Sequence, residues 1–541
     1  MTAALSWRQI AAAASSGLLL TLSFPRPQLA LAAWFALVPL LLAIATASRR
    51  GAFLLGWIAG ATFFTGSLRW LVYTMVHYGH LPEWLGYPLL LLLAAYLAVY
   101  VGLFALTALI LANQRTWIRL VALPAAWTAV ELTRTYLFTG LPWGALGYSQ
   151  AGTLPVIQIA EFTGVYGVSY LIVFVNTALA VALAAMRPTG EMPMPIPVAS
   201  FVPMQGPPVS LRGVAGPLGL AVLALLAVLV YGHWRLDQIA GAMAETTPVT
   251  VAVVQGNIDQ DRKWDPAFRR ETIDRYQALT REQADQPLDL IVWPEAAMPF
   301  FFERDVAHRE ELIEFVVREG TPLLFGSPAV ESAVGEQPRL YNSAYVVTAN
   351  GGIAGRYDKL HLVPFGEYVP LERLLFFVNK MVDGIGEFVP GENATVFRLD
   401  RFRLGVMICF EVVFPELTRA AVRNGATLMA AITNDAWFGR SAAPYQHLDM
   451  VVFRAVENRV PFARAANTGI SGFIDATGRL VTTSDLFVPA TRVATLVPRM
   501  EKTWYTRYGD LFAWFCAVFV LAVLARAARE ARREACRGKP S

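Results

Sequence analysis

The chain has 541 residues, of which 55% are hydrophobic and only 16% are charged, and its mean hydropathy is +0.44. Soluble chains carry roughly 25% charged residues, so a protein that is soluble throughout is excluded. The net charge of +4 is small and no block of basic residues occurs that would follow phosphates, which argues against nucleic acid as a partner.

Eight apolar stretches are candidates for membrane-spanning helices, which need about 20 mostly apolar residues. The first could be a signal peptide, but the second begins only a few residues later, so an uncleaved helix is preferred. The eight stretches cover residues 10–24, 29–47, 51–68, 84–112, 120–130, 162–186, 217–231 and 511–525.

Lysine and arginine concentrate in alternate loops between these stretches, as they do in cytoplasmic loops. The opposing loop at residues 77–83 carries neither residue. We therefore expect both termini in the cytoplasm and the long segment after the seventh span on the outer side. The basic positions are Arg8, Arg49, Arg50, Arg115, Arg119, Arg187, Arg212 and the tail from residue 526 to 539.

Glu131 and Arg134 stand three residues apart at the outer end of the fifth expected span. Ionisable residues within a membrane are candidates for function. A helix-end pair that only reaches toward the interface is the plainer interpretation. The sequence leaves both open.

The segment from about residue 244 to 507 holds most of the charge in the chain. Short apolar runs at residues 247–255, 288–293, 322–326, 403–408 and 427–433 are typical of buried strands. Helical patterns at residues 266–284 and 306–319 lie between some of them. This alternation predicts an α/β layered domain, in which ligands gather at the carboxyl ends of strands. Glu295 and Cys409 each follow such a strand.

Three segments carry groups suited to acyl transfer: VWPEAAMPF around Glu295, YDKLHLVPFGEYVP around Lys359 and GVMICFEVVFPE around Cys409. A cysteine attacks acyl carbons and forms a thioester, a carboxylate can take its proton, and an ammonium can stabilise the oxyanion. A lysine nearby would also lower the pKa of the thiol. Taken singly, Cys409 fits a buried small hydrophobe, Glu295 a helix cap and Lys359 a surface lysine.

Cys409 is the only cysteine of the outer segment, so it has no disulfide partner there, and an unpaired thiol in an oxidising compartment is notable. No pair of cysteines two residues apart and no cysteine–histidine cluster occurs in the sequence. A structural metal site is therefore not expected.

Together, the three segments resemble the nitrilase superfamily, whose domains use a Glu-Lys-Cys triad in this chain order, over roughly residues 249–496. The triad would be Glu295, Lys359 and Cys409. Many soluble members have Arg-Phe-Pro-Glu after the cysteine, where this chain has Val413-Phe414-Pro415-Glu416. That departure weakens the case for a soluble type of amidase.

Three further runs, QGNIDQDRKW at 255–264, HLVPFGEYVP at 361–370 and LPWGALGYSQ at 141–150, look like the apolipoprotein N-acyltransferase family. The resemblance implies seven spans in residues 1–243, a periplasmic nitrilase-like αββα sandwich in 244–500, and an eighth span with a basic cytoplasmic tail in 501–541. The resemblance also implies that the protein lies in the bacterial inner membrane.

The implied reaction is ping-pong. A phospholipid, typically phosphatidylethanolamine, acylates Cys409, and the α-amine of a diacylglyceryl-cysteine lipoprotein then accepts the acyl group. No cofactor is implied. Glu295 would be the general base and Lys359 would hold the oxyanion.

The resemblance also implies supporting residues. Glu367 and Glu411 match a second and a third acid of the family, and Glu411 would share a face with Cys409 if that segment stays extended. Phe410 matches a position that is often tyrosine. Trp264 matches a tryptophan near the lipid-handling region, for which an interfacial anchor is the plainer interpretation.

A lipid substrate needs a side opening, and the apolar residues Phe301 and Phe302, with residues 374–378, are candidates for gating it. Ordinary core packing is their alternative. A membrane-tethered nitrilase-type amidase, with water as the acceptor and a polar closed cleft, is the rival enzyme. A transporter is the rival outside enzymes, but the paired halves that it predicts are not visible in the sequence.

Overall fold

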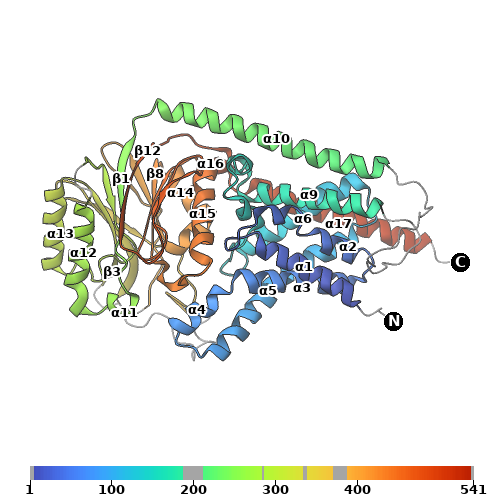
Figure 1. Cartoon of the computed structure of the whole chain (residues 1–541), viewed down its shortest axis with the longest axis horizontal. Coiled ribbons are helices and arrows are strands. Elements are labelled where there is room, and N and C mark those ends of the chain that lie inside the picture. Colours follow the sequence, from blue (N-terminus) through green and yellow to red (C-terminus); the bar gives the residue numbers. More distant parts are fainter. Residues whose placement is uncertain (1–4, 187–210, 283–285, 333–337, 370–386, 538–541) are drawn as a thin grey trace, which may run out of the picture.

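The computed structural model describes residues 5–186, 211–282, 286–332, 338–369 and 387–537. A helical half holds both ends of the chain, and a half built on two β-sheets lies beside it (Figure 1). The expected gating segment 374–378 lies outside the described residues.

Two six-stranded sheets form the second half, in the orders β12-β1-β2-β3-β4-β5 and β11-β10-β9-β8-β7-β6. Within each sheet three neighbouring strands are parallel, β1–β2–β3 and β7–β8–β9, and the outer strands are antiparallel. The strands are β1 Val249–Gln255, β2 Leu290–Val292, β3 Leu323–Glu331, β4 Arg339–Val347, β5 Ile353–Asp358, β6 Val396–Arg398, β7 Arg403–Ile408, β8 Leu428–Thr433, β9 Phe462–Ala466, β10 Gly472–Ile474, β11 Leu480–Thr483 and β12 Ala490–Leu496.

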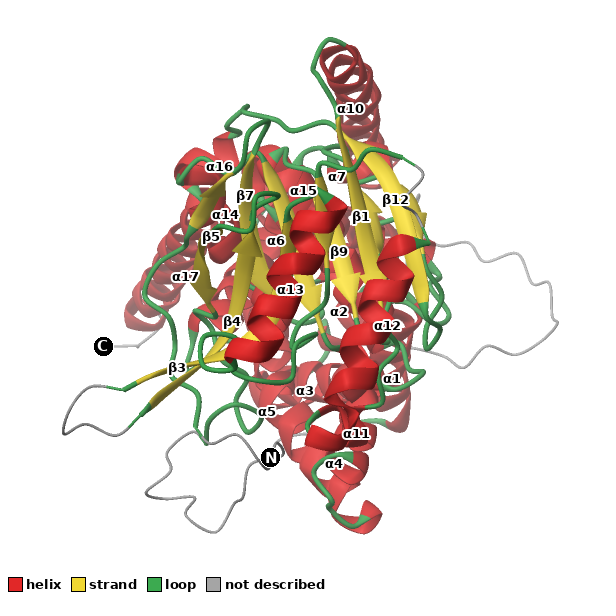
Figure 2. Cartoon of the chain, turned by 90° about the vertical axis from the view of Figure 1, so that its left-hand side faces the viewer, coloured by secondary structure: helices red, strands yellow, loops and turns green. Residues whose placement is uncertain are grey.

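The sheets pack face to face, and a layer of helices covers each outer face (Figures 1 and 2). Apolar side chains from both sheets, such as Val253, Leu324 and Val406, share one buried cluster. The four-layer αββα sandwich expected from the sequence is confirmed. The helices are α12 Arg269–Arg281 and α13 Val306–Glu319 on one side, and α14 Pro415–Arg423 and α15 Ala443–Asn458 on the other, with the short α11 Gln260–Lys263 after β1.

In the described part of the helical half, four helices are long and apolar enough to cross a membrane: α5 Glu83–Ile110, α9 Val165–Ala185, most of α10 Leu211–Ala244 and most of α17 Leu511–Arg537. A bent pair, α3 Arg49–Ser67 and α4 Trp70–His77, meets at 54° and makes a fifth if it counts as one span.

The other expected spans differ from plain long helices. Helix α1 Trp7–Leu22 has 16 residues, and the stretch 29–47 divides into a 3-10 turn, Ala30–Trp34, and α2 Val38–Ile44. Helix α6 Thr116–Tyr136 carries Arg119, Glu131 and Arg134. The count of eight spans therefore stays a prediction. The remaining helices are the short α7 Leu154–Ile157, α8 Ala160–Thr163 and α16 Trp504–Tyr508.

The two halves share a continuous hydrophobic core. Helices α14 and α15 lie between the second sheet and the helical half (Figure 1). One buried cluster joins Phe63, Trp127 and Tyr148 of the helical half to Phe414, Val422 and Val452 of the sandwich. The layer of α14 and α15 is therefore packed against the helical half. The strand ends beside this layer face a space that both halves border.

Candidate active site

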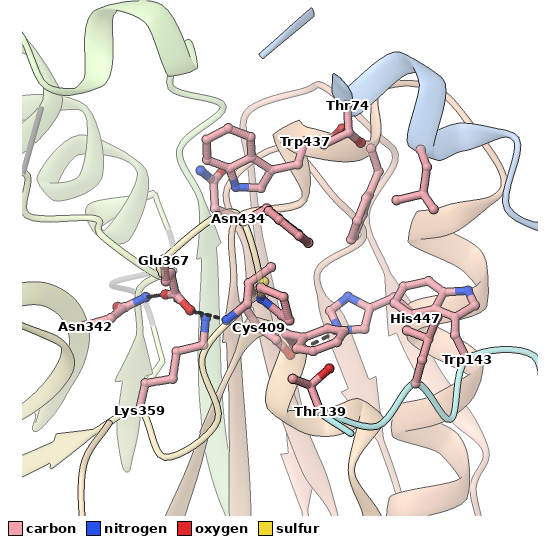
Figure 3. Close-up of a pocket in the computed structure, with 18 of the residues that line it drawn as sticks. Thr74, Thr139, Trp143, Asn342, Lys359, Glu367, Cys409, Asn434, Trp437 and His447 are labelled. Atoms are coloured by element: carbon pink, nitrogen blue, oxygen red, sulfur yellow. Dashed lines mark hydrogen bonds and ion pairs between the residues drawn. The ribbon is translucent and has the colours of Figure 1, made fainter. Parts of the chain in front are cut away.

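The three candidate triad residues follow strands and line one cavity of about 440 Å³. Glu295 comes three residues after β2, Lys359 directly after β5 and Cys409 directly after β7. All three are buried, with exposed fractions of 7%, 1% and 8%. Figure 3 shows Cys409 between Lys359 and Glu367 on one side and His447 and Trp143 on the other.

Cys409 begins a 3-10 turn, Cys409–Val413, with a left-handed φ of 53°. A non-glycine residue rarely adopts this conformation, and its strain is tolerated where the surroundings hold the backbone. The candidate nucleophile, Cys409, therefore stands on a sharp turn between β7 and α14. This turn also corrects the expectation that Glu411 shares an extended face with Cys409.

Glu295, Asn342, Lys359 and Glu367 form an interlocked polar group, here named the catalytic wall. The Lys359 ammonium donates to Glu367 at 2.9 Å and lies 3.7 Å from Glu295. The Asn342 amide donates to Glu295 at 2.8 Å and to Glu367 at 2.7 Å. The second oxygen of Glu295 accepts the backbone N–H of Asn434 at 2.9 Å.

The backbone around Glu295 is also tightly held. A Cβ atom at Gly326 of β3 would lie 2.5 Å from the nitrogen of Ala296 and 2.8 Å from the Cα of Glu295. Only glycine permits this approach. The carboxylate is thus fixed by both its hydrogen bonds and its chain.

The electrostatics of the wall favour a protonated thiol and a charged lysine. Burial raises the pKa of the Cys409 thiol above its usual range, Glu295 adds to the rise, and Lys359 opposes it. Burial acts against the charge on Lys359, but Glu367 and Glu295 hold the pKa of the lysine above its ordinary value. The expected lowering of the thiol pKa by lysine is therefore outweighed, and the proton must leave as the thiol attacks.

Lys263 is a second buried lysine at the cavity, and sequence reasoning missed it. Its ammonium donates to the backbone oxygen of Glu295 at 3.0 Å. Burial lowers the pKa of Lys263 to about 8, while Glu295 and Cys409 act in the opposite direction. Its position on the short helix α11, rather than at a strand end, gave no signal in the sequence.

The supporting residues have different places. Glu367 belongs to the catalytic wall, and its second oxygen accepts the N–H of Val363 at 2.8 Å. Glu411 is fully buried outside the cavity, where it accepts the Tyr357 hydroxyl at 2.8 Å and the N–H groups of Leu360 and Ile408 at 2.6 and 2.7 Å. Glu411 therefore joins the lysine loop to the cysteine turn.

A buried network missed from the sequence lies behind the nucleophile. His447 Nε2 is 3.1 Å from the carbonyl oxygen of Cys409, and its Nδ1 is 3.1 Å from Arg464 Nη2. Arg464 also donates to Asp435 at 2.7 Å. Burial, with Arg464 close by, lowers the pKa of His447. Nδ1 also lies 3.2 Å from Asp435 Oδ1, which accepts the Thr433 hydroxyl at 2.8 Å. Because the Cys409 carbonyl can only accept and the Arg464 guanidinium can only donate, the neutral ring that satisfies both contacts carries its proton on Nε2.

The opposite side of the cavity comes from the helical half and is almost wholly apolar. We name its residues Tyr96, Leu97, Arg134, Phe138 and Trp143 the membrane wall. Phe138 is 81% exposed and Tyr96 is 40% exposed, so apolar surface continues from the cavity to the outside.

Of the three residues predicted to bind or gate the lipid, Trp264 lines the cavity and Phe301 and Phe302 do not, while the predicted supporting residue Phe410 also lines it. Trp264 lines it with its indole N–H buried and unpartnered, and Phe410 lines it beside His361 and Phe414. Phe301 and Phe302 do not border the cavity. Phe302 is fully buried against Phe325 and Tyr345, so core packing explains this residue, whereas Phe301 is only partly buried and its gating role stays a prediction.

No group of three or more histidine, cysteine, aspartate or glutamate side chains suited to a metal ion occurs among the described residues. The catalytic wall instead satisfies its carboxylates with lysine, amide and backbone donors. A carboxylate and an ammonium held in this way can act as a base and a cation beside a cysteine.

The chain was compared with known proteins. Residues 16–178 match the family model "Apolipoprotein N-acyltransferase N-terminal domain", and residues 250–505 match "Carbon-nitrogen hydrolase". An amidase structure from Nesterenkonia sp. aligns with 49% of the chain and 96% of its own at 22% identity, with a TM-score of 0.37.

Two curated relatives align with most of the chain, and both are named apolipoprotein N-acyltransferase. The protein from Geobacter metallireducens is 43% identical over 95% of this chain and 94% of its own. The protein from Methylococcus capsulatus is 32% identical over 96% of each. The chain therefore belongs to the apolipoprotein N-acyltransferase family.

Proposed function

We propose that this protein transfers a fatty acyl chain from a phospholipid, typically phosphatidylethanolamine, to the α-amine of the N-terminal diacylglyceryl-cysteine of lipoproteins. The observation that carries the proposal is the position of Cys409. The thiol stands in one cavity between a polar wall from the sandwich and an apolar wall from the helical half. Such a cavity suits an ester carbonyl attached to long hydrocarbon chains.

In the first step the Cys409 sulfur attacks the ester carbonyl while its proton passes to Glu295. The oxyanion that forms is stabilised by Lys359, which Glu367 and Asn342 hold in place. Collapse breaks the bond to the glycerol oxygen, which takes the proton from Glu295 and leaves as a lysophospholipid. The acyl group remains on Cys409 as a thioester.

In the second step the neutral α-amine of the lipoprotein attacks the thioester carbonyl. Glu295 takes a proton from the amine, and the same cation stabilises the second oxyanion. Collapse forms the amide and returns the proton to the sulfur. Because the thiol is protonated at rest, one base serves both steps without a preformed thiolate.

We further propose the topology that the basic loops predict. Residues 1–243 would supply seven spans and residues 501–541 an eighth span with its cytoplasmic tail, in the bacterial inner membrane. The catalytic domain of residues 244–500 would then face the periplasm. The apolar contact between the two halves supports a domain that stands directly on the membrane, where substrate tails need not enter water.

The rival function, a membrane-tethered amidase, would use the same residues with water as acceptor. The apolar lining of the cavity and its exposed apolar rim favour a lipid over a small amide. The direct test supplies purified protein in detergent with phosphatidylethanolamine and a diacylglyceryl-cysteine peptide, and follows the peptide by mass. We expect an N-acylated peptide from the wild type and none from Cys409→Ser. Release of free fatty acid without acylated peptide would instead identify a hydrolase.

A further inference from the structure

Arg134 is a charged residue that the proposed steps do not use, although it lines the cavity of Cys409. It lies near the carboxyl end of helix α6 and is 5% exposed. Its own carbonyl accepts the N–H of Leu141 at 3.0 Å, which fixes the turn that carries Phe138 and leads to Trp143. Arg134 is the charged side chain of the membrane wall.

The guanidinium of Arg134 has no acceptor among the described residues. Its Nε and Nη2 atoms are buried without a hydrogen-bond partner, and no carboxylate of the described chain lies within 4.0 Å. One oxygen of Glu131, one turn earlier on α6, accepts the Trp127 indole at 2.7 Å and the N–H of Leu146 at 2.8 Å. Its other oxygen is also buried without a hydrogen-bond partner in the described part of the chain, so Glu131 attracts the guanidinium through space but accepts no hydrogen bond from it. The guanidinium carbon lies 5.1 Å from the centre of the Phe64 ring, a cation–π contact that offers no hydrogen-bond acceptor.

The other cationic side chains of the cavity are satisfied. Lys359 donates to Glu367, and Lys263 donates to the backbone of Glu295. A buried guanidinium whose N–H groups have no hydrogen-bond acceptor is unfavourable, so a bound anion that accepts from it would be favoured at this place. The planar fork of arginine is suited to the paired oxygens of a phosphate.

The surroundings define the rest of the ligand. Apolar side chains such as Leu97 and Phe138 line the same cavity as Arg134, and Phe138 extends this apolar surface to the exposed rim. A small hydrophilic anion would gain little from these contacts. An amphiphile, with an anionic group beside hydrocarbon chains, would use both the guanidinium and the apolar wall.

We propose that Arg134 binds the phosphodiester of the glycerophospholipid that donates the acyl chain. This inference rests on the proposed function for the identity of the donor. Only a few covalent bonds separate an ester carbonyl from the phosphorus in such a lipid. A lipid whose carbonyl reaches Cys409 therefore has its phosphate inside or at the edge of the same cavity.

The test compares Arg134→Gln with the control Arg115→Gln, which changes an exposed arginine at the other end of α6, outside the cavity. Acylation of Cys409 is measured in the full chain with two donors, phosphatidylethanolamine and para-nitrophenyl butyrate, which has no phosphate. We expect Arg134→Gln to lower the phospholipid rate relative to the butyrate rate by about tenfold or more, as for a lost charged hydrogen bond. Arg134→Lys should give a ratio of phospholipid to butyrate rates between those of the wild type and Arg134→Gln, since lysine keeps the charge but lacks the planar guanidinium.

An equal loss with both donors, or no loss with either, would overturn the proposal. A second measurement uses the wild type alone, in case the variant does not fold. Hexadecylphosphocholine and the neutral hexadecylglycerol compete with para-nitrophenyl butyrate for Cys409, and the phosphodiester should inhibit about tenfold more strongly. Equal inhibition would contradict a phosphodiester site. This arm needs no phospholipid turnover, so it separates failure of the site from failure of the proposed donor.

Discussion

The two walls of the cavity differ in how far the protein itself satisfies their polar groups. In the catalytic wall, Glu295, Lys359 and Glu367 each have hydrogen-bond partners within the wall, and Asn342 joins the two carboxylates. In the membrane wall, Arg134 has no acceptor among the described residues. A wall whose polar groups are hydrogen-bonded to one another is preorganised for chemistry. A polar group without a hydrogen-bond partner in an apolar wall is ready to bind a ligand.

Of the variants in the catalytic wall, Glu295→Gln should lower the rate of acyl-enzyme formation most. The amide keeps the size of the side chain but cannot take the thiol proton, and the thiol does not lose that proton by itself. We expect acyl-enzyme formation from either a phospholipid or a short ester to fall by about 10²–10⁴-fold. Mass measurement of the acylated protein against time checks this, and an unchanged rate would remove Glu295 as the base.

Lys359→Ala removes the cation that we propose to stabilise the oxyanion. It also leaves the carboxylates of Glu295 and Glu367 facing each other through Asn342, without their counter-charge. Acylation should fall by about 10²–10³-fold, and thermal unfolding should shift to lower temperature. A variant with near-wild-type acylation would exclude Lys359 from the proposed triad.

Glu367→Gln tests whether the wall holds Lys359 in place. The variant keeps a hydrogen-bond acceptor for the ammonium but loses the charge. We expect acylation to fall by about ten- to a hundredfold, because the hydrogen bond to the ammonium loses its charge and the amide nitrogen cannot accept the N–H of Val363. The loss should be smaller than with Lys359→Ala, since the ammonium itself remains. A larger loss than that of Lys359→Ala would point instead to direct proton transfer by Glu367.

His447→Phe should have the smallest effect of these variants, because His447 contacts Cys409 only at its backbone carbonyl. The ring volume stays similar, but the N–H donor to the Cys409 carbonyl is lost. One neutral hydrogen bond corresponds to a loss of about fivefold. His447→Gln, which offers an amide donor, should recover part of the acylation rate. Equal rates for the two variants would show that this hydrogen bond does not position the cysteine.

The meeting of Glu295 and Cys409 in one cavity could be predicted, because Cys409 follows β7 directly and Glu295 comes three residues after β2, at strand ends where side chains of parallel sheets meet. The remaining partners depend on contacts between distant elements. Asn342 lies within β4, and Asn434 contributes a backbone N–H, which no side-chain pattern encodes. The apolar character of Phe302 was misleading, because a loop side chain that packs on a sheet is as apolar as one at a rim open to lipid.

The spans show a similar limit. Helices α5 and α9 match the apolar stretches closely because they are long and free of internal charge. The stretch 29–47 is equally apolar but is interrupted between its 3-10 turn and α2. Hydropathy measures only the preference for lipid, whereas breaks in a helix depend on how the neighbouring helices pack.

The central claim, that Cys409 carries the acyl chain from phospholipid to amine, is tested most directly by a two-stage mass measurement on the intact protein. Wild-type protein is first incubated with phosphatidylethanolamine alone, and a diacylglyceryl-cysteine peptide is then added. We predict an added fatty acyl mass on Cys409 in the first stage, and its complete loss in the second as the N-acylated peptide appears. Acylated peptide formed without any adduct on Cys409, or an adduct that the peptide cannot remove, would contradict the account.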